Sequence, residues 1–297
     1  MTAAGRLLLG FLIASAACAQ EAGLNVPGRA EPVPLAQEEP RDDAWTLRVT
    51  ADMGGAYFSY GETLSSQRVK STFEEGSFGF QTKLELNLSG FSPYLGVGTV
   101  LGGGRESARL PTARQENDLS VATTLFDLGL GYRVQPGPSI ALVPTLGYTL
   151  DFMSFERSEF ELDGVKVLLQ DLNGRVARKI DETILGHGVT AGLGLEFRVS
   201  SVLHLDTFAS YTFLPDVEVD NDLGGVFSSE GYLIRGGVGA GAVVGRISVR
   251  GTVQVGSREL DKSRAKIVSG SAASAVFTFP RSSTLWVFVG VGVQVTF

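Results

Sequence analysis

The sequence predicts an all-β protein, a transmembrane antiparallel up-and-down β-barrel of about 12 strands, with about 10 strands as the alternative. Three observations predict this fold class. From Trp45 onward, apolar and polar residues alternate with a period of two, which is the side-chain period of a strand. The mean hydropathy is +0.15, but no run of roughly 18 uncharged apolar residues follows the N-terminal segment. Short turns alternate with long polar connections, which is typical of membrane barrels.

Composition excludes some classes of partner. Lys and Arg total 25 against 32 Asp and Glu, giving a formal net charge of -7, so no basic excess is present to neutralise nucleic-acid phosphates. The 38 glycines and three methionines fit strands and tight turns better than packed helices. The single cysteine, Cys18, excludes an intrachain disulfide.

The N-terminal segment has the pattern of a secretory signal peptide over residues 1–19. Arg6 supplies the positive charge, residues 7–17 are apolar, and small residues allow cleavage before Gln20. The alternative is a lipoprotein box at residues 15–18, in which Cys18 is acylated and becomes the mature N-terminus; either route exports the protein. Residues 20–43 contain four prolines and many acidic residues, which predicts a disordered linker, and the barrel domain is expected over residues 44–297.

The first three predicted strands lie between Trp45 and Leu101. Their apolar faces consist of Trp45, Leu47, Val49, Ala51 and Met53; Phe78, Phe80, Thr82, Leu84, Leu86 and Leu88; and Phe91, Pro93, Leu95, Val97, Thr99 and Leu101. Partners in a hairpin must keep their apolar residues on the same face. Leu88 opposite Phe91 meets this condition and leaves Ser89-Gly90 as a two-residue loop, a length that hairpins favour.

Four further turns preserve the face assignment in the same way. The predicted pairings are Val134 with Ile140, Val244 with Ile247, Phe279 with Leu285, and residues 195–197 with residues 203–205. Gly245 stands where a type II′ turn requires glycine. Alternation that survives five turns indicates one continuous antiparallel sheet.

Long polar connections are expected between the hairpins. They span approximately residues 61–77, 102–118, 155–183, 214–231 and 258–265. The strands recognised directly number about 11, but a barrel with both termini on one side needs an even number. We therefore predict an additional strand within residues 155–183, where Val165, Val167 and Leu169 alternate and Asn173-Gly174 favours a turn.

The last stretch, Leu285 to Phe297, has one fully apolar face and one mixed face. Its length suits a tilted bilayer crossing of roughly 9–11 residues plus its ends. This terminal aromatic strand resembles the C-terminal signal of bacterial outer-membrane β-barrel proteins. The resemblance implies the outer membrane of a Gram-negative bacterium, contact with outer-membrane lipid and lipopolysaccharide, and recognition of Leu285–Phe297 by the barrel-assembly machinery.

Charged residues of both signs occupy positions that face the predicted lumen. They are Arg48, Asp52, Lys83, Glu85, Asp127, Arg133, Asp151, Glu196, Arg198, Asp206, Arg235 and Arg250. Such residues either pair across the wall and make it rigid or line a narrow polar passage. The predicted function is accordingly a non-enzymatic barrel, either a narrow passive pore or a structural barrel that displays its loops.

His204 carries the alternative, an outer-membrane lipid hydrolase. It faces inward with Asp206, and hairpin register brings Glu196 and Arg198 alongside, which gives a base oriented by a carboxylate. Outer-membrane lipid hydrolases place such groups toward lipid, whereas this cluster faces the lumen, and Ser210 is far along the strand. The second histidine, His187, is predicted to point outward.

Two other patterns suggest ligands but do not predict sites. Asp216 to Asp222 carries alternating carboxylates suited to calcium, but it lacks the glycine and terminal Glu of an EF-hand loop, so a solvated acidic loop is favoured. Gly237 to Ala242 matches a dinucleotide fingerprint only formally, because it lies inside a strand. We predict no catalytic, cofactor-binding or metal-binding residues, and no cofactor.

Overall fold

The computed structural model describes residues 45–64, 69–171, 173–270 and 274–297, so the predicted signal peptide, Cys18 and the acidic linker lie outside the described residues. Residues 46–297 form one compact unit. Its ten long strands are β1 (Thr46–Leu64), β2 (Val69–Asn87), β3 (Phe91–Arg109), β4 (Arg114–Tyr132), β6 (Ile140–Leu162), β10 (Lys179–Arg198), β11 (Leu203–Asn221), β12 (Gly225–Val244), β13 (Ile247–Leu260) and β16 (Arg281–Thr296). No described helix is long and apolar enough to cross a bilayer.

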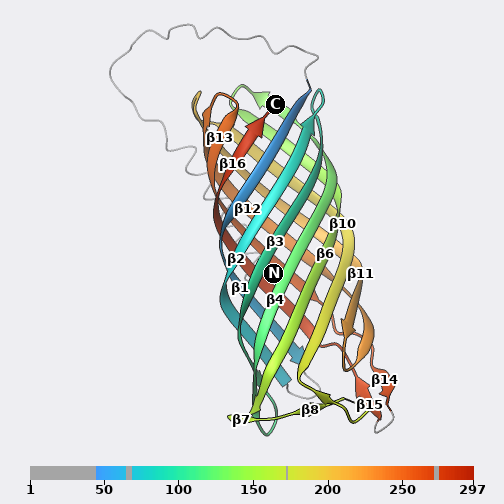
Figure 1. Cartoon of the computed structure of the whole chain (residues 1–297). Coiled ribbons are helices and arrows are strands. Elements are labelled where there is room, and N and C mark those ends of the chain that lie inside the picture. Colours follow the sequence, from blue (N-terminus) through green and yellow to red (C-terminus); the bar gives the residue numbers. More distant parts are fainter. Residues whose placement is uncertain (1–44, 65–68, 172, 271–273) are drawn as a thin grey trace, which may run out of the picture. The chain divides into compact units, whose positions relative to one another are not determined.

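The long strands close into an antiparallel barrel (Figure 1). Each pairs with its neighbour in the chain, β6 pairs with β10, and β16 pairs with both β13 and β1. Closure leaves no free sheet edge, as a membrane-spanning sheet requires. The predicted fold class, a transmembrane antiparallel β-barrel, is confirmed.

In the part of the chain that the structure describes, six short strands lie outside this ring. They are β5 (Val134–Gly137), β7 (Val165–Lys166), β8 (Leu169–Gln170), β9 (Val176–Ala177), β14 (Lys266–Ser269) and β15 (Ser274–Phe277). Figure 1 shows β7, β8, β14 and β15 at the end of the barrel opposite the C-terminus. We call their end the loop end and the opposite end, where the strands join by short turns, the turn end.

The strand number in the ring is ten, the predicted alternative, because the described residues within 155–183 supply no additional crossing strands. β6 continues to Leu162 and β10 begins at Lys179, with only two-residue strands between them. The predicted turn at Asn173-Gly174 is present, where the amide of Asp171 donates to the carbonyl of Arg175 at 2.9 Å. It joins β8 to β9 outside the barrel wall.

The short turns follow the predicted register at three of five places. Leu88 pairs with Phe91 across Ser89 and Gly90, whose φ angles of 48° and 95° are those of a type I′ turn. Val244 pairs with Ile247 across Gly245, whose φ is 63°. Phe197 pairs with Leu205, as the odd-length loop between β10 and β11 requires.

The other two predicted pairings are wrong. Val134 pairs with Leu142 because a bulge in β5 shifts the register. Phe279 does not pair with Leu285; it is only 3% exposed, because its ring joins the apolar core, and Leu285 pairs instead with Ser257 of β13.

The polarity of the outward side chains changes along each long strand and divides it into two parts. From the turn end they are apolar, as Val289, Val291 and Val293 of β16 illustrate with exposed fractions of 57%, 66% and 44%. Toward the loop end they become mainly polar, and this part begins on the ten strands near Ser59, Glu74, Arg105, Ser120, Ser154, Thr183, Asp216, Glu230, Ser257 and Ser283. The apolar parts are the membrane-spanning segments, and we call the remainder the loop-end extension.

The polarity of the inward face changes in the opposite sense. The membrane-spanning segments face the lumen with many charged and hydroxyl side chains, whereas the loop-end extension fills it with apolar ones. The buried apolar cluster includes Phe58, Tyr60, Phe73, Leu119, Met153, Phe155, Ile184, Leu214, Val217, Val219, Leu233, Leu260 and Phe279. The predicted long polar connections are therefore largely strands, because strands outside a bilayer bury their apolar side chains inward.

Candidate functional site in the barrel lumen

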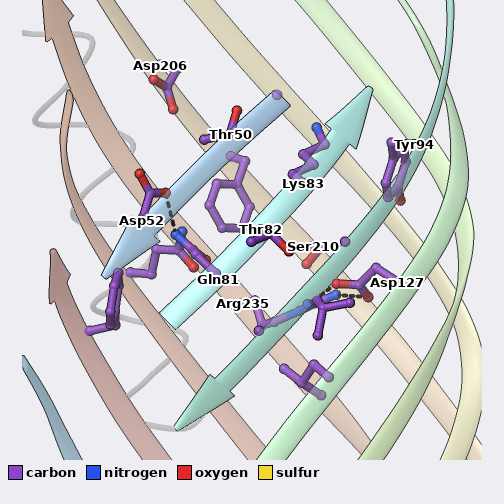
Figure 2. Close-up of a pocket in the computed structure, with 18 of the residues that line it drawn as sticks. Thr50, Asp52, Gln81, Thr82, Lys83, Tyr94, Asp127, Asp206, Ser210 and Arg235 are labelled. Atoms are coloured by element: carbon purple, nitrogen blue, oxygen red, sulfur yellow. Dashed lines mark hydrogen bonds and ion pairs between the residues drawn. The ribbon is translucent and has the colours of Figure 1, made fainter. Parts of the chain in front are cut away.

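A chamber of about 310 Å³ lies in the lumen between the membrane-spanning segments. All ten long strands contribute to its lining, with Tyr94, Asp127, Ser210 and Arg235 among the polar side chains that Figure 2 shows. Gly96, Gly98 and Gly194 line this chamber, and their lack of side chains leaves space at its wall. The predicted inward charges thus surround a real but small space.

An ion pair crosses the chamber. Arg235 of β12 donates two hydrogen bonds to the carboxylate of Asp127 on β4, at 2.6 and 2.8 Å (Figure 2). Three other long strands, β6, β10 and β11, lie between β4 and β12 on the shorter way round the barrel. A bidentate pair between a guanidinium and a carboxylate fixes both distance and orientation, so this contact braces separate parts of the wall.

A row of hydroxyl groups extends from the same carboxylate. Thr149 donates to Asp127 at 2.6 Å, and its oxygen lies 2.6 Å from that of Thr190. Thr190 in turn lies 2.7 Å from Thr212. All three threonines are buried, so their hydroxyl groups satisfy one another where water has no access.

Toward the turn end, a second ionic group spans the lumen. Glu196 of β10 contacts Arg48 of β1 at 3.3 Å and Arg133 at 2.6 Å, and Arg48 also lies 3.4 Å from Glu85. Lys83 completes the group through Glu85 at 2.6 Å. Predicted lumen charges of opposite sign therefore pair across the barrel as well as between neighbouring strands.

Arg250 joins two more of the predicted carboxylates. It lies 3.6 Å from Asp52 and 3.2 Å from Asp206, while Gln81 donates to Asp52 at 2.8 Å. Arg198, the remaining predicted lumen charge at this end, is instead exposed near the β10–β11 turn.

The chamber ends where the apolar core begins, because Trp286 and Phe288 belong to both. Within this region Arg258 and Asp151 form an ion pair at 3.0 Å, with side chains only 1% and 3% exposed. Arg258 also donates to Thr284 at 3.2 Å and contacts the sulfur of Met153. Sequence reasoning missed Arg258, since it placed residues 258–265 in a loop; its position in phase with the inward Arg250 was the available signal.

The His204 group is partly as predicted. His204 pairs in register with Arg198, and Asp206 with Glu196, but the Glu196 carboxylate is directed to Arg48 and Arg133. A Cβ at Gly241 would lie 2.4 Å from the His204 ring and 2.7 Å from the Ser248 hydroxyl, so these two side chains share the space above that glycine. The sequence reasoning considered Ser210, which lies farther along β11, as the hydroxyl partner of His204. The hydroxyl that lies beside His204 is instead that of Ser248.

The remaining candidates lie outside the lumen. His187 points outward, as predicted, and its Nε2 is 3.9 Å from Asp216. Asp216, Glu218 and Asp220 are exposed on β11 with Val217 and Val219 buried between them. Because alternate residues of a strand are spaced apart along one face, these carboxylates do not converge, and the described residues contain no cluster suited to a metal ion.

Comparison with solved structures supports the barrel architecture described above. No family model and no curated protein sequence matches the chain. The outer membrane protease OmpT from Escherichia coli is structurally similar, with TM-score 0.63 and 13% identity over 86% of this chain and 98% of that one. The transport unit of the Escherichia coli autotransporter AIDA-I gives TM-score 0.38 and 11% identity, over 89% and 94%. The Ralstonia pickettii toluene transporter TbuX gives 0.35 and 10%, over 84% and 89%.

At these identities the likeness to OmpT shows the fold alone. The chain has the architecture of an outer-membrane β-barrel, and the activities named for the similar structures remain theirs.

Proposed function

We propose that this protein is a non-enzymatic barrel of a Gram-negative outer membrane, with a closed lumen and a structural or loop-displaying role. The observation that carries the proposal is the filling of the lumen beyond the chamber. Phe58, Met153, Ile184 and Leu233 are 0% exposed there, and the Arg258–Asp151 pair lies among them. Interiors packed in this way contain few voids larger than a water molecule, which favours a scaffold over a passive pore.

Orientation and assembly follow from the same proposal. The short turns face the periplasm, the loop-end extension faces outside, and the apolar outward face contacts outer-membrane lipid and lipopolysaccharide. Leu285–Phe297 serves as the recognition strand for the barrel-assembly machinery. Its outward side chains Leu285, Val289, Val291, Val293 and Phe297 are exposed on the barrel surface, which supports that role.

Single-channel recording tests the closed lumen. Residues 20–297, refolded and inserted into a planar bilayer at acidic pH, are expected to give no conductance steps, because no water-filled path crosses the apolar core. Insertion is verified by resistance of the barrel to added protease. Uniform conductance steps under these conditions would contradict the proposal and establish a pore.

The hydrolase alternative rests on the neighbouring His204 and Ser248 side chains. No hydrogen bond joins them among the described residues, both lie inside the lumen, and Ser248 is 3% exposed, all of which disfavours attack on a membrane lipid. Overexpression of the wild type and of His204→Ala is expected to leave lipid A and phospholipid profiles identical. New lipid products in the wild type alone would instead support the hydrolase.

A further inference from the structure

The loop-end extension contains a buried ionic cluster that joins distant parts of the wall. Arg157 of β6 lies 2.8 Å from Glu106 of β3, 3.2 Å from Glu62 of β1 and 3.7 Å from Glu182 of β10. The side chains of Arg157, Glu106 and Glu182 are at most 10% exposed, and that of Glu62 is 19% exposed. One guanidinium therefore connects four strands at the end of the barrel that the apolar core closes.

The cluster has three carboxylates for a single cation. Neutral donors supply part of the difference: Tyr60 donates to Glu62, Ser71 and Asn117 donate to Glu106, and Asn221 donates to Glu182. One oxygen of Glu182, directed at Arg157, accepts no hydrogen bond among the described residues. Because buried charge is costly unless it is paired, this arrangement is short of positive charge.

A proton on Glu62 supplies the positive charge that the cluster lacks. The pKa of Glu62 is raised to about 7. Burial is the largest cause and the nearby carboxylates of Glu182 and Glu106 add to the rise, while Arg157 opposes it. Burial also raises the pKa of Glu106, but the Arg157 charge and the hydrogen bonds outweigh burial and leave that pKa below its ordinary value. Glu62 is thus the carboxyl that holds the proton.

We propose that Arg157, Glu62, Glu106 and Glu182 form a proton-dependent latch that holds the loop end of the barrel closed. The proposal rests on the closed-barrel function above and adds its regulation. With the proton bound, the four charges sum to one negative charge; when the proton passes to bulk water, they sum to two. The added charge lies beside the apolar core, where the Arg157 guanidinium is 5.2 Å from the Phe155 ring. A single Arg157 cation then faces three carboxylates, and the repulsion of Glu62 on β1 by Glu106 on β3 and Glu182 on β10 loosens the closed loop end.

The sign of the pH dependence follows from the raised pKa. Between the ordinary pKa of a glutamic acid, 4.5, and the folded-state value of about 7, the closed barrel binds more protons than the opened one. Its stability is therefore fully present below this window and is lost as the pH rises through it.

Single-channel recording at about pH 5.5 and about pH 8.5, on either side of the folded-state pKa of about 7, tests the latch. The refolded wild type, residues 20–297, is expected to be silent at the lower pH and to open intermittently at the higher one. Its open probability is expected to rise at least roughly tenfold between the two pH values, which corresponds to a loss of about 1.4 kcal/mol in the stability of the closed state. Glu62→Gln, which is neutral at every pH, is expected to stay silent at both. Glu218→Gln removes an exposed charge from the same end of the barrel and is expected to behave like the wild type.

Each other result has a distinct meaning. Current from the wild type at both pH values overturns the closed-barrel function itself. Silence at both, from protein shown to be inserted, overturns the latch and leaves the closed barrel standing. Opening of Glu62→Gln at the higher pH also overturns the latch. Amide hydrogen exchange at residues 58–64 and 153–162 gives a second measurement, since it should increase with pH in the wild type and not in Glu62→Gln.

Discussion

Replacing Arg258 with Met is expected to lower the free energy of unfolding by about 3–5 kcal/mol, because it leaves the Asp151 carboxylate buried without its cation. The two side chains are 1% and 3% exposed, so water cannot replace the lost partner. The change also removes the hydrogen bond to Thr284. Denaturant unfolding of the refolded barrel in detergent, followed by the fluorescence of nearby Trp286, measures the loss.

Two matched variants separate the buried charge from other effects. Arg281→Met removes a guanidinium that is 63% exposed and paired with Glu259, and is expected to cost less than about 1 kcal/mol. The double variant Arg258→Met with Asp151→Leu removes both charges and is expected to regain most of the lost stability. A single Arg258→Met variant within about 1 kcal/mol of the wild type would show that this pair does not hold the lumen closed.

The membrane-spanning segments were predictable because lipid imposes one rule on every strand. Apolar residues must face outward, and a register error reverses the face, so the turns at Leu88–Phe91 and Val244–Ile247 were fixed by alternation alone. The loop-end extension follows the reverse rule. Val217 and Val219 alternate as regularly as any membrane strand, but their exposed neighbours are acidic, and the segment was therefore interpreted as a loop.

The lumen charges were predictable one by one, but most of their partners were not. Asp127 and Arg235 are separated by 108 residues, and they meet only because a ring of ten strands brings β4 and β12 within reach of each other. Strand number and stagger set which residues face each other across a barrel, and neither is encoded in local periodicity. Arg157 and Glu62, 95 residues apart, were missed for the same reason.

Replacing Val291 with Arg is expected to lower the free energy of unfolding in a lipid bilayer by about 2–4 kcal/mol, the cost of arginine on a lipid-facing strand near the bilayer midplane. Val291 is 66% exposed and lies midway along the outward apolar face of β16, between Leu285 and Phe297. Reversible unfolding of the barrel from phospholipid vesicles measures this change. In detergent the effect should be smaller, since the micelle deforms around a charge more easily than a bilayer does.

Ser283→Arg provides the control on the same face of the same strand. Ser283 points outward from the loop-end extension, where the outward residues of β16 are already polar, so arginine there remains in water and is expected to change stability by less than about 1 kcal/mol. Equal destabilisation at the two positions would mean that Ser283 also lies in the membrane, and the boundary assigned above to the membrane-spanning segment of β16 would be wrong. A negligible effect at both would mean that this face does not contact lipid at all, because only a hydrocarbon environment distinguishes Val291 from Ser283 on an otherwise continuous strand.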